Sequence, residues 1–344
     1  MSVQELRIDP LSGHRTIVAG ERSRRPGGEP CCEPPQPIDV EQDPFADGHE
    51  QRTPPELYAV RPGGGPADSP GWSVRVVPNL YPALVSAADG GDGAGGTGAP
   101  APIAQPHEVR GQVELFASLP AQGAHEVIVN GPQPVLTLAE LPVAQVTAAV
   151  EVWRERMRAH AHSAYVQLIV NERREAGASL PHTHAQLYAL GFVPAAVARE
   201  RERASAYTTR TMGQNLLGDL VAEEVRRRER IVAIDEEAVL LAPYASRLPF
   251  QLMLAPRVPR ARFEDDGPTG AALLHDGLRR LARHLGSSPP LNLWVRTAPR
   301  GTEDFCWRID VMPRLTHLAG LELSTDLNLN IVAPEDAAAK LREA

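Results

Sequence analysis

Hydrophobic residues recur at helical spacing in one long segment, residues 139–163. Val146, Val150, Trp153 and Met157 follow one another at steps of three and four residues, which places them on one face of a helix. The segment therefore predicts an amphipathic helix. Similar patterns predict further helices over 194–206, 212–230 and 270–285, and a short one from residue 334.

Short apolar or alternating runs between turn residues predict strands. They lie over 72–77, 112–118, 125–130, 165–170, 184–190, 231–242, 250–255, 291–297 and 305–311. The first 65 residues are rich in proline, glycine and charge, which predicts extended segments and turns, and residues 87–106 predict a surface loop. Strands, helix and strands follow in that order twice. The fold is therefore predicted to be α/β of the α+β type, with two related units built on mostly antiparallel sheets.

Composition and charge narrow the function classes. The 344-residue chain is 42% hydrophobic, as in soluble proteins with a core. It has no apolar run of the ~18 residues that a membrane helix needs, and the first residues lack the apolar segment of a signal peptide. We therefore expect no membrane association. The formal net charge of −8 argues against a nucleic-acid partner.

Two residue types exclude particular chemistries. Lys340 is the only lysine, which excludes a Walker-type phosphate loop and lysine Schiff-base chemistry. Three cysteines, two of them adjacent, exclude a disulfide framework. We therefore expect a reduced, cytoplasmic protein.

The most informative segment ends in Pro-His182-Thr-His184-Ala-Gln186. Side chains alternate along a strand, so the two histidines and Gln186 share one face, while Thr183 and Ala185 face the other way. Two imidazoles and an amide make a poor core face. The alternative is a row of surface histidines on an edge strand.

This polar row fits phosphoryl or nucleotidyl transfer. A neutral imidazole is a nucleophile at pH 7 once a hydrogen bond holds its other nitrogen. Gln186 can donate to a phosphoryl oxygen, and Gly177 and Ser179 can supply further donors. A metal hydrolase is the alternative, but it normally adds carboxylates, and the nearest one, Glu175, lies in the preceding loop.

The same segment resembles the active-site strand of galactose-1-phosphate uridylyltransferases, which belong to the histidine-triad superfamily. Further motifs in the matching order extend the resemblance over almost the whole chain. They lie at residues 7–13, 21–26, 74–84, 123–129, 245–250, 313–322 and 338–342. The resemblance implies two histidine-triad-like halves, 1–190 and 191–344, each a curved and mostly antiparallel sheet with helices. It also implies a homodimer.

The resemblance implies roles for single residues. His184 is expected to be the nucleophile that takes a nucleoside monophosphate, with Gln186 and Ser179 holding the phosphate oxygens. The residues expected to bind the nucleotide or the sugar phosphate are Arg22, Arg25, Asn79, Asn171 and Glu322. The alternative for the arginines is a basic turn cluster, and for the asparagines an ordinary turn position.

The zinc ligands of the family are only partly present. Family members usually carry an early Cys-x-x-Cys pair that binds zinc together with two histidines. Residues 43–46 stand in place of that pair, which leaves His125, His182 and Asp43 as candidate ligands. A rearranged site would draw on Cys31, Cys32, Asp47 or His49. We expect no tightly bound zinc, and in its absence we expect Asp43 to accept a hydrogen bond from a histidine.

A second metal site of some family members uses a His-x-His pair in a late strand. Cys306 and Arg308 stand at that place, and arginine is not a metal ligand. The Arg308 guanidinium can occupy a cation's place or simply pair with the Asp310 side of the strand.

These observations predict a nucleotidyltransferase with a nucleotide sugar and a sugar 1-phosphate as partners. UDP-glucose and galactose 1-phosphate are the family pair, and the path is a double displacement through a nucleotidyl-histidine. The alternatives are a phosphorylase or hydrolase acting on a nucleoside-diphosphate sugar, and a degenerate homologue that only binds nucleotide sugars.

Overall fold

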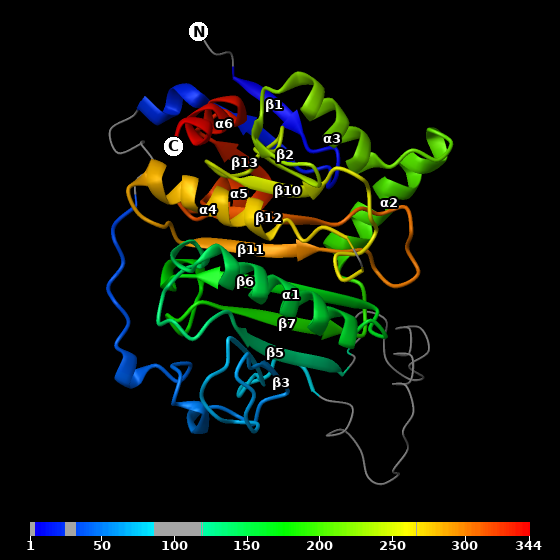
Figure 1. Cartoon of the computed structure of the whole chain (residues 1–344). Helices are drawn as coiled ribbons and strands as arrows, with labels where there is room; N and C mark the ends of the chain where they lie inside the picture. Colours follow the sequence, from blue (N-terminus) through cyan, green and yellow to red (C-terminus); the bar gives the residue numbers. More distant parts are fainter. Residues whose placement is uncertain (1–3, 25–31, 86–117, 119, 266) are drawn as a thin grey trace.

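The computed structural model describes residues 4–24, 32–85, 118, 120–265 and 267–344 (Figure 1). The predicted loop over 87–106, and the predicted strand over 112–118 apart from Ser118, lie outside the described residues. In the described part of the chain, no helix has both the length and the apolar character that crossing a membrane requires.

Ten strands form one large sheet that runs through both halves of the chain. Their order is β3-β4-β5-β7-β6-β11-β12-β10-β9-β8, and all neighbours are antiparallel. The strands are Tyr58–Val60 (β3), Val74–Pro78 (β4), Gly123–Val129 (β5), Tyr165–Glu172 (β6), His184–Leu190 (β7), Ile231–Ile234 (β8), Ala238–Leu241 (β9), Leu252–Pro256 (β10), Leu291–Arg296 (β11) and Arg308–Pro313 (β12). β6 and β11 join the two halves at the centre.

The two sets of five strands share one internal order. In the first half, α1 (Val143–Ala159) connects β5 to β6, and β7 then lies between those two strands. In the second half, α4 (Ala271–Leu285) connects β10 to β11, and β12 lies between them. β7 and β12 thus hold the same place in their halves, as the predicted pair of related α/β units requires.

One face of the large sheet packs against α1 and α4, which lie in front of it in Figure 1. Leu187 and Leu293 of the sheet are buried in the same core as Trp153 of α1 and Leu278 of α4. Burying a side chain of this size contributes about 1.5–3 kcal/mol, so this face anchors the strands. The alternate residues of each strand point to the opposite face.

The opposite face is covered mainly in the second half. There, Val221 of α3 (Leu216–Arg227) packs on Val239 and Met253 of the sheet, and α2 (Ala195–Arg210) lies beside α3. A three-stranded sheet of β1 (Glu5–Ile8), β2 (Arg15–Val18) and β13 (Leu327–Asn330) joins the two ends of the chain. The first strands of the chain therefore pair with a strand of the second half, which the predicted division at residue 190 does not anticipate.

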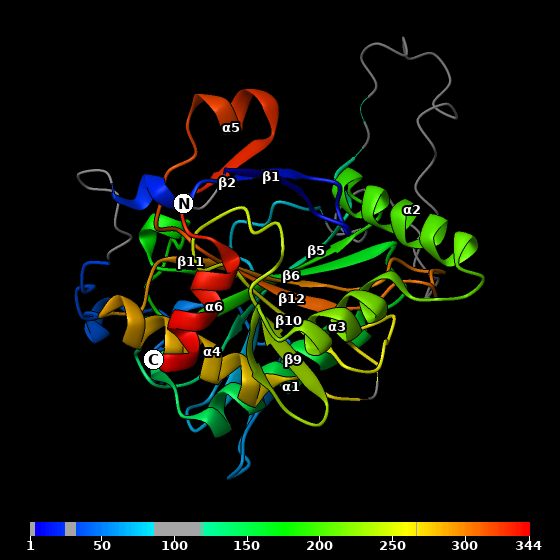
Figure 2. The ribbon, with the colours of Figure 1, turned by 90° about the horizontal axis from the view of Figure 1, so that it is seen from above.

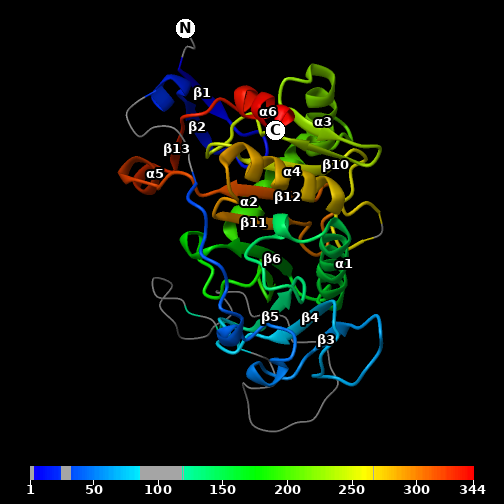
Figure 3. The ribbon, with the colours of Figure 1, turned by 60° about the vertical axis from the view of Figure 1, so that its left-hand side comes forward.

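Two helices follow the late strands. α6 (Pro334–Glu343) packs against α4, as the pattern from residue 334 predicts. The short α5 (Gly320–Thr325) packs on β13 and projects from the rest of the molecule in Figures 2 and 3. Sequence analysis did not predict α5.

The predicted run over 231–242 is a hairpin rather than one strand. Asp235 follows β8, and its carboxylate accepts hydrogen bonds from the backbone N–H groups of Glu237 and Ala238. An aspartate that bonds its own following backbone forms a turn, which reverses the chain into β9.

Candidate active site

β7 has the two faces that the sequence predicts. Ala185 and Leu187 are buried in the core under α1, and Thr183 is buried just before the strand. His184 and Gln186 lie on the opposite face, with Gln186 only half-buried. The register places Val129 of β5 opposite His184 and Val127 opposite Gln186, so a paired strand flanks β7 on this side. The alternative of an edge strand is wrong.

His184 is held with one ring nitrogen free. Its Nδ1–H donates to the backbone carbonyl of His182 at 2.7 Å, which leaves the lone pair on Nε2. The ring is 5% exposed, and burial lowers its pKa. Phe45 packs edge-on against it, with ring centroids 5.3 Å apart. A neutral imidazole with a fixed tautomer is the form that acts as a nucleophile.

Gln186 is held by its oxygen. The backbone N–H of Ala83 donates to His125 Nδ1 at 3.2 Å, so the hydrogen of His125 sits on Nε2 and is donated to Gln186 Oε1 at 3.0 Å. The Tyr188 hydroxyl donates to the same oxygen at 2.8 Å. With its oxygen occupied, the amide presents its two N–H groups as donors, which suits a phosphoryl oxygen.

The two candidate asparagines also reach this face. Asn79 directly follows β4 and lies beside the His125 ring, and its amide oxygen accepts a hydrogen bond from the backbone N–H of Tyr81 at 2.8 Å. Val170 pairs with Ala185, so the next residue of β6, Asn171, falls beside His184. Asn292 of β11 donates to Asn171 Oδ1 at 2.8 Å and to the carbonyl of Ala176 at 2.7 Å, which ties the loop before Ser179 to the site.

Ser179 is exposed along an open groove that Arg173, Arg174 and Gly177 also line. Gly177 has a φ of +93°, a left-handed conformation that suits glycine and turns the chain into the groove. The Ser179 hydroxyl is therefore accessible just before β7, on a loop that Asn292 holds through the Ala176 carbonyl.

Two predicted substrate-binding residues, Arg22 and Glu322, are not brought to this face. Arg22 follows β2 and is exposed, and Glu322 lies on α5, where it accepts a hydrogen bond from the backbone N–H of Ala319 at 3.0 Å. Both belong to the region of the three-stranded sheet, and in Figure 3 α5 projects away from β5 and β6, the two neighbours of β7. Arg25 lies outside the described residues.

His182 is tied to Asp43 by a fully buried pair. Its Nδ1 lies 2.6 Å from Asp43 Oδ2 and its Nε2 lies 2.8 Å from the carbonyl oxygen of Gly131, with both side chains 0% exposed. Each ring nitrogen of His182 thus faces an acceptor oxygen. The hydrogen bond expected at Asp43 is thus present, and it fixes the carbonyl that orients His184.

Comparisons with known proteins agree with this geometry. The model of the galactose-1-phosphate uridyl transferase N-terminal domain matches residues 75–194. ADP-glucose phosphorylase of Arabidopsis thaliana is 27% identical over 98% of this chain and 92% of that protein. Galactose-1-phosphate uridylyltransferase of Cryptococcus neoformans is 26% identical over 98% of this chain and 89% of that protein.

A crystal structure of the Arabidopsis ADP-glucose phosphorylase with bound ADP-glucose gives a TM-score of 0.77 at 25% identity, covering 99% of both chains. In sequence and fold the chain is thus similar to the galactose-1-phosphate uridylyltransferases, as a divergent relative. Residues 136–344, more than half of the chain, match a domain of unknown function (DUF4921), and the chain belongs to that family.

The zinc site of the uridylyltransferase family does not fit the residues found here. His125 lies opposite Tyr188, whereas His184 lies opposite Val129, which is about 13 Å farther along β5 at ~3.3 Å per residue. His125 therefore lies beside Gln186 and Tyr188, whereas His182 lies against Asp43, so the structure does not bring the three predicted ligands together. Among the described residues, no group of three or more His, Cys, Asp or Glu side chains is placed to hold a metal ion.

The alternative ligands are placed elsewhere. Cys32 Sγ accepts a hydrogen bond from Arg173 at 2.9 Å, and Cys31 lies outside the described residues. His49 Nδ1 donates to the backbone carbonyl of Asp43 at 2.7 Å, and Asp47 accepts from the N–H of Gly71.

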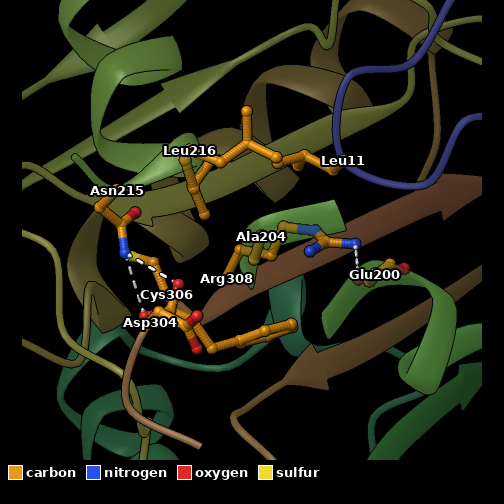
Figure 4. Close-up of a pocket in the computed structure, with 10 residues that line it drawn as sticks. Leu11, Glu200, Ala204, Asn215, Leu216, Asp304, Cys306 and Arg308 are labelled. Carbon is orange, nitrogen blue, oxygen red and sulfur yellow. Dashed lines mark hydrogen bonds and ion pairs between the residues drawn. The ribbon is translucent and has the colours of Figure 1, made fainter. Parts of the chain in front are cut away.

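The second family metal site is replaced by ion pairs. Arg308 of β12 contacts Glu200 of α2 at 3.0 Å (Figure 4). It also contacts Asp310 at 3.0 Å, and all three side chains are buried. Of the two sequence interpretations, pairing with Asp310 is therefore present. Cys306 is buried beside them, and burial raises its thiol pKa to about 11, which makes it a poor thiolate ligand.

Sequence reasoning missed three residues of the site. Tyr188 continues the alternation of His184 and Gln186, so the period of two could have identified it. Phe45 and Asn292 come from distant segments, and only the fold and the β6–β11 register bring them to His184 and Asn171.

Proposed function

We propose that this protein transfers a nucleoside monophosphate from a nucleoside-diphosphate sugar through a nucleotidyl-His184 intermediate. His184 Nε2 attacks the α-phosphorus, the bond to the bridging oxygen breaks, and the sugar 1-phosphate leaves with the bond electrons. An acceptor phosphate oxygen then attacks the same phosphorus and releases neutral His184. The observation that carries the proposal is the hydrogen bond from His184 Nδ1 to the His182 carbonyl, which leaves Nε2 free.

The surrounding groups support both steps. The Gln186 amide is placed to donate to a phosphoryl oxygen as negative charge grows there. Asn171 and Ser179 supply further donors beside the strand. Because the leaving group is a stable anion, the reaction requires no strong general acid, and no buried acid with a raised pKa is needed at β7.

Two acceptors are candidates. A sugar 1-phosphate gives a transferase of the UDP-glucose:galactose-1-phosphate type, which the uridylyltransferase relatives support. Inorganic phosphate gives a phosphorylase, which is favoured by the likeness to ADP-glucose phosphorylase over nearly the full length of both chains. The first half-reaction is the same in both.

We also propose that a homodimer completes the sugar site. Arg22 and Glu322 lie near the three-stranded sheet and cannot serve His184 of their own chain, but a second copy can present them. Mixing His184→Ala and Glu322→Ala chains tests this, because hybrid dimers regain one complete site. Restored turnover is expected, and no gain over the separate variants contradicts a shared site.

The function is tested with a panel of nucleotide sugars. UDP-glucose and ADP-glucose are each incubated with galactose 1-phosphate, with inorganic phosphate, or with neither. Products are followed by phosphorus NMR. Release of a nucleoside diphosphate only with phosphate identifies a phosphorylase, and a new nucleotide sugar identifies a transferase. No consumption of any nucleotide sugar contradicts the proposal.

A further inference from the structure

A polar cavity of about 110 Å³ lies on the same face of the sheet as His184 but in the second half. A single water needs about 10–15 Å³ by this measure, so the cavity has room for a small ligand. Its walls come from residues 9–12 and 243–247, from β11 and β12, and from the first turns of α2. Two of the sequence motifs, 7–13 and 245–250, meet there, and the proposed chemistry at His184 uses neither.

Three hydrogen-bond donors that line this cavity have no acceptor among the described residues. The indole Nε1 of Trp294 is buried and has no partner among the described residues. The Arg247 guanidinium stacks over the Trp294 ring at 5.9 Å, and within the described part of the chain no carboxylate pairs with it. Gln251 is 7% exposed, and its oxygen accepts from the Arg247 backbone N–H at 2.7 Å, which leaves the amide nitrogen as a donor.

The lining holds three arginines and three carboxylates. Arg308 pairs with Asp310 and Glu200, and Arg296 Nε lies 3.3 Å from Glu200 Oε2. The third carboxylate, Asp9, accepts hydrogen bonds from the backbone N–H groups of Leu11 and Ser12. Among the described residues, Arg247 is therefore the arginine of the lining that contacts no carboxylate. The first turn of α2 borders the cavity through Ala196, and its cap residue, Pro194, provides no side-chain cap. Unbonded N–H groups at a helix start favour an anion.

We propose that this cavity binds the phosphate group of a small ligand, either inorganic phosphate or a phosphomonoester. Donors that approach from a guanidinium, an indole and an amide suit a tetrahedral oxyanion, whereas a planar carboxylate offers acceptors in one plane only. The site binds without reacting, because Arg308 stands on β12 where β7 has His184, and a guanidinium is not a nucleophile at neutral pH. The inference does not rest on the function proposed for His184.

Tryptophan fluorescence of the full-length protein tests the proposal directly. Inorganic phosphate, glucose 1-phosphate and acetate are titrated at constant ionic strength into the wild type, Arg247→Gln, Trp294→Phe and Arg279→Gln. Arg279 is an exposed arginine of α4 on the far face of the sheet and serves as the matched control. Calorimetry gives Kd for each variant, and circular dichroism checks the fold.

We expect saturable binding of at least one phosphate ligand and an emission change that Trp294→Phe abolishes. Arg247→Gln should raise Kd at least tenfold, and Arg279→Gln should leave it unchanged. Tighter binding of glucose 1-phosphate identifies a phosphomonoester site, and tighter binding of phosphate identifies the free ion. Absence of saturable binding, a Kd unaffected by Arg247→Gln, or equal binding of acetate would overturn the proposal.

Discussion

β7 and β12 occupy the same place in two similar five-stranded sets, yet their side chains have opposite properties. β7 begins with His184 and carries Gln186 two residues later, while β12 begins with Arg308 and carries Asp310 two residues later. His184 keeps a free ring nitrogen, whereas Arg308 is bound to two carboxylates. The same backbone position therefore carries the proposed nucleophile in one half and a buried ion pair in the other.

The elements that pack over β7 and β12 explain why His184 keeps a free nitrogen and Arg308 does not keep a free charge. Over β12, α2 brings Glu200 into contact with Arg308, and a buried arginine between two carboxylates is held in place. Over β7, no helix of the described chain intervenes, and Phe45 packs against the His184 ring from a loop. A reactive imidazole must be reachable by a substrate. A structural ion pair needs a cover that keeps other molecules away from it.

The largest expected effect is that of His184→Ala. The variant should lose about 10³-fold or more of the nucleotidyl-transfer rate, because no other group replaces the nucleophile. Initial rates measure this. His162→Ala, a change at an exposed histidine after α1, is the control and should retain full activity. Comparable losses of rate in both variants would contradict the role of His184 as the nucleophile.

Gln186→Ala should lower the chemical rate by about 10²–10³, because a donor to the transition state is lost. Single-turnover rates separate this from substrate affinity, which should change little. A change confined to KM would mean that Gln186 only binds substrate.

Arg308→Met should act on stability and not on chemistry. Removing the guanidinium leaves Asp310 buried without its cation and Glu200 with Arg296 alone, which costs about 3–5 kcal/mol of the free energy of unfolding. Urea unfolding measures this cost. The turnover of the folded variant should equal that of the wild type, and a loss of turnover in folded protein would place β12 in the chemistry.

The alternation of residues 183–187 could be predicted from sequence because a strand buried on one face repeats every second residue. The position of His125 could not be predicted, because the register between β5 and β7, and not sequence spacing, places it opposite Tyr188. For the same reason, the partners of Asn171 and Arg308 come from distant segments. Glu322 belongs to the motif at residues 313–322, but in the structure it lies on α5, away from β7.

A smaller effect concerns pH. Burial lowers the pKa of His184 below its ordinary value near 6.5, so Nε2 is unprotonated at pH 7. As the pH falls through that lowered pKa, the proton occupies the nucleophile, and the rate should drop about tenfold per unit. Rate profiles between pH 5 and 8 test this, and Arg308→Met should give the same profile. A rate that rises toward pH 5 would contradict a neutral nucleophile.

The most direct test is to look for the covalent intermediate. The protein is incubated with UDP-glucose or ADP-glucose in the absence of acceptor, and its intact mass and peptide map are measured. We predict the added mass of one nucleoside monophosphate, labile to acid, on the peptide that contains His184 and on no peptide from β12. Turnover without any such adduct, or an adduct that persists in His184→Ala, would contradict the assignment of β7 as the nucleophile strand.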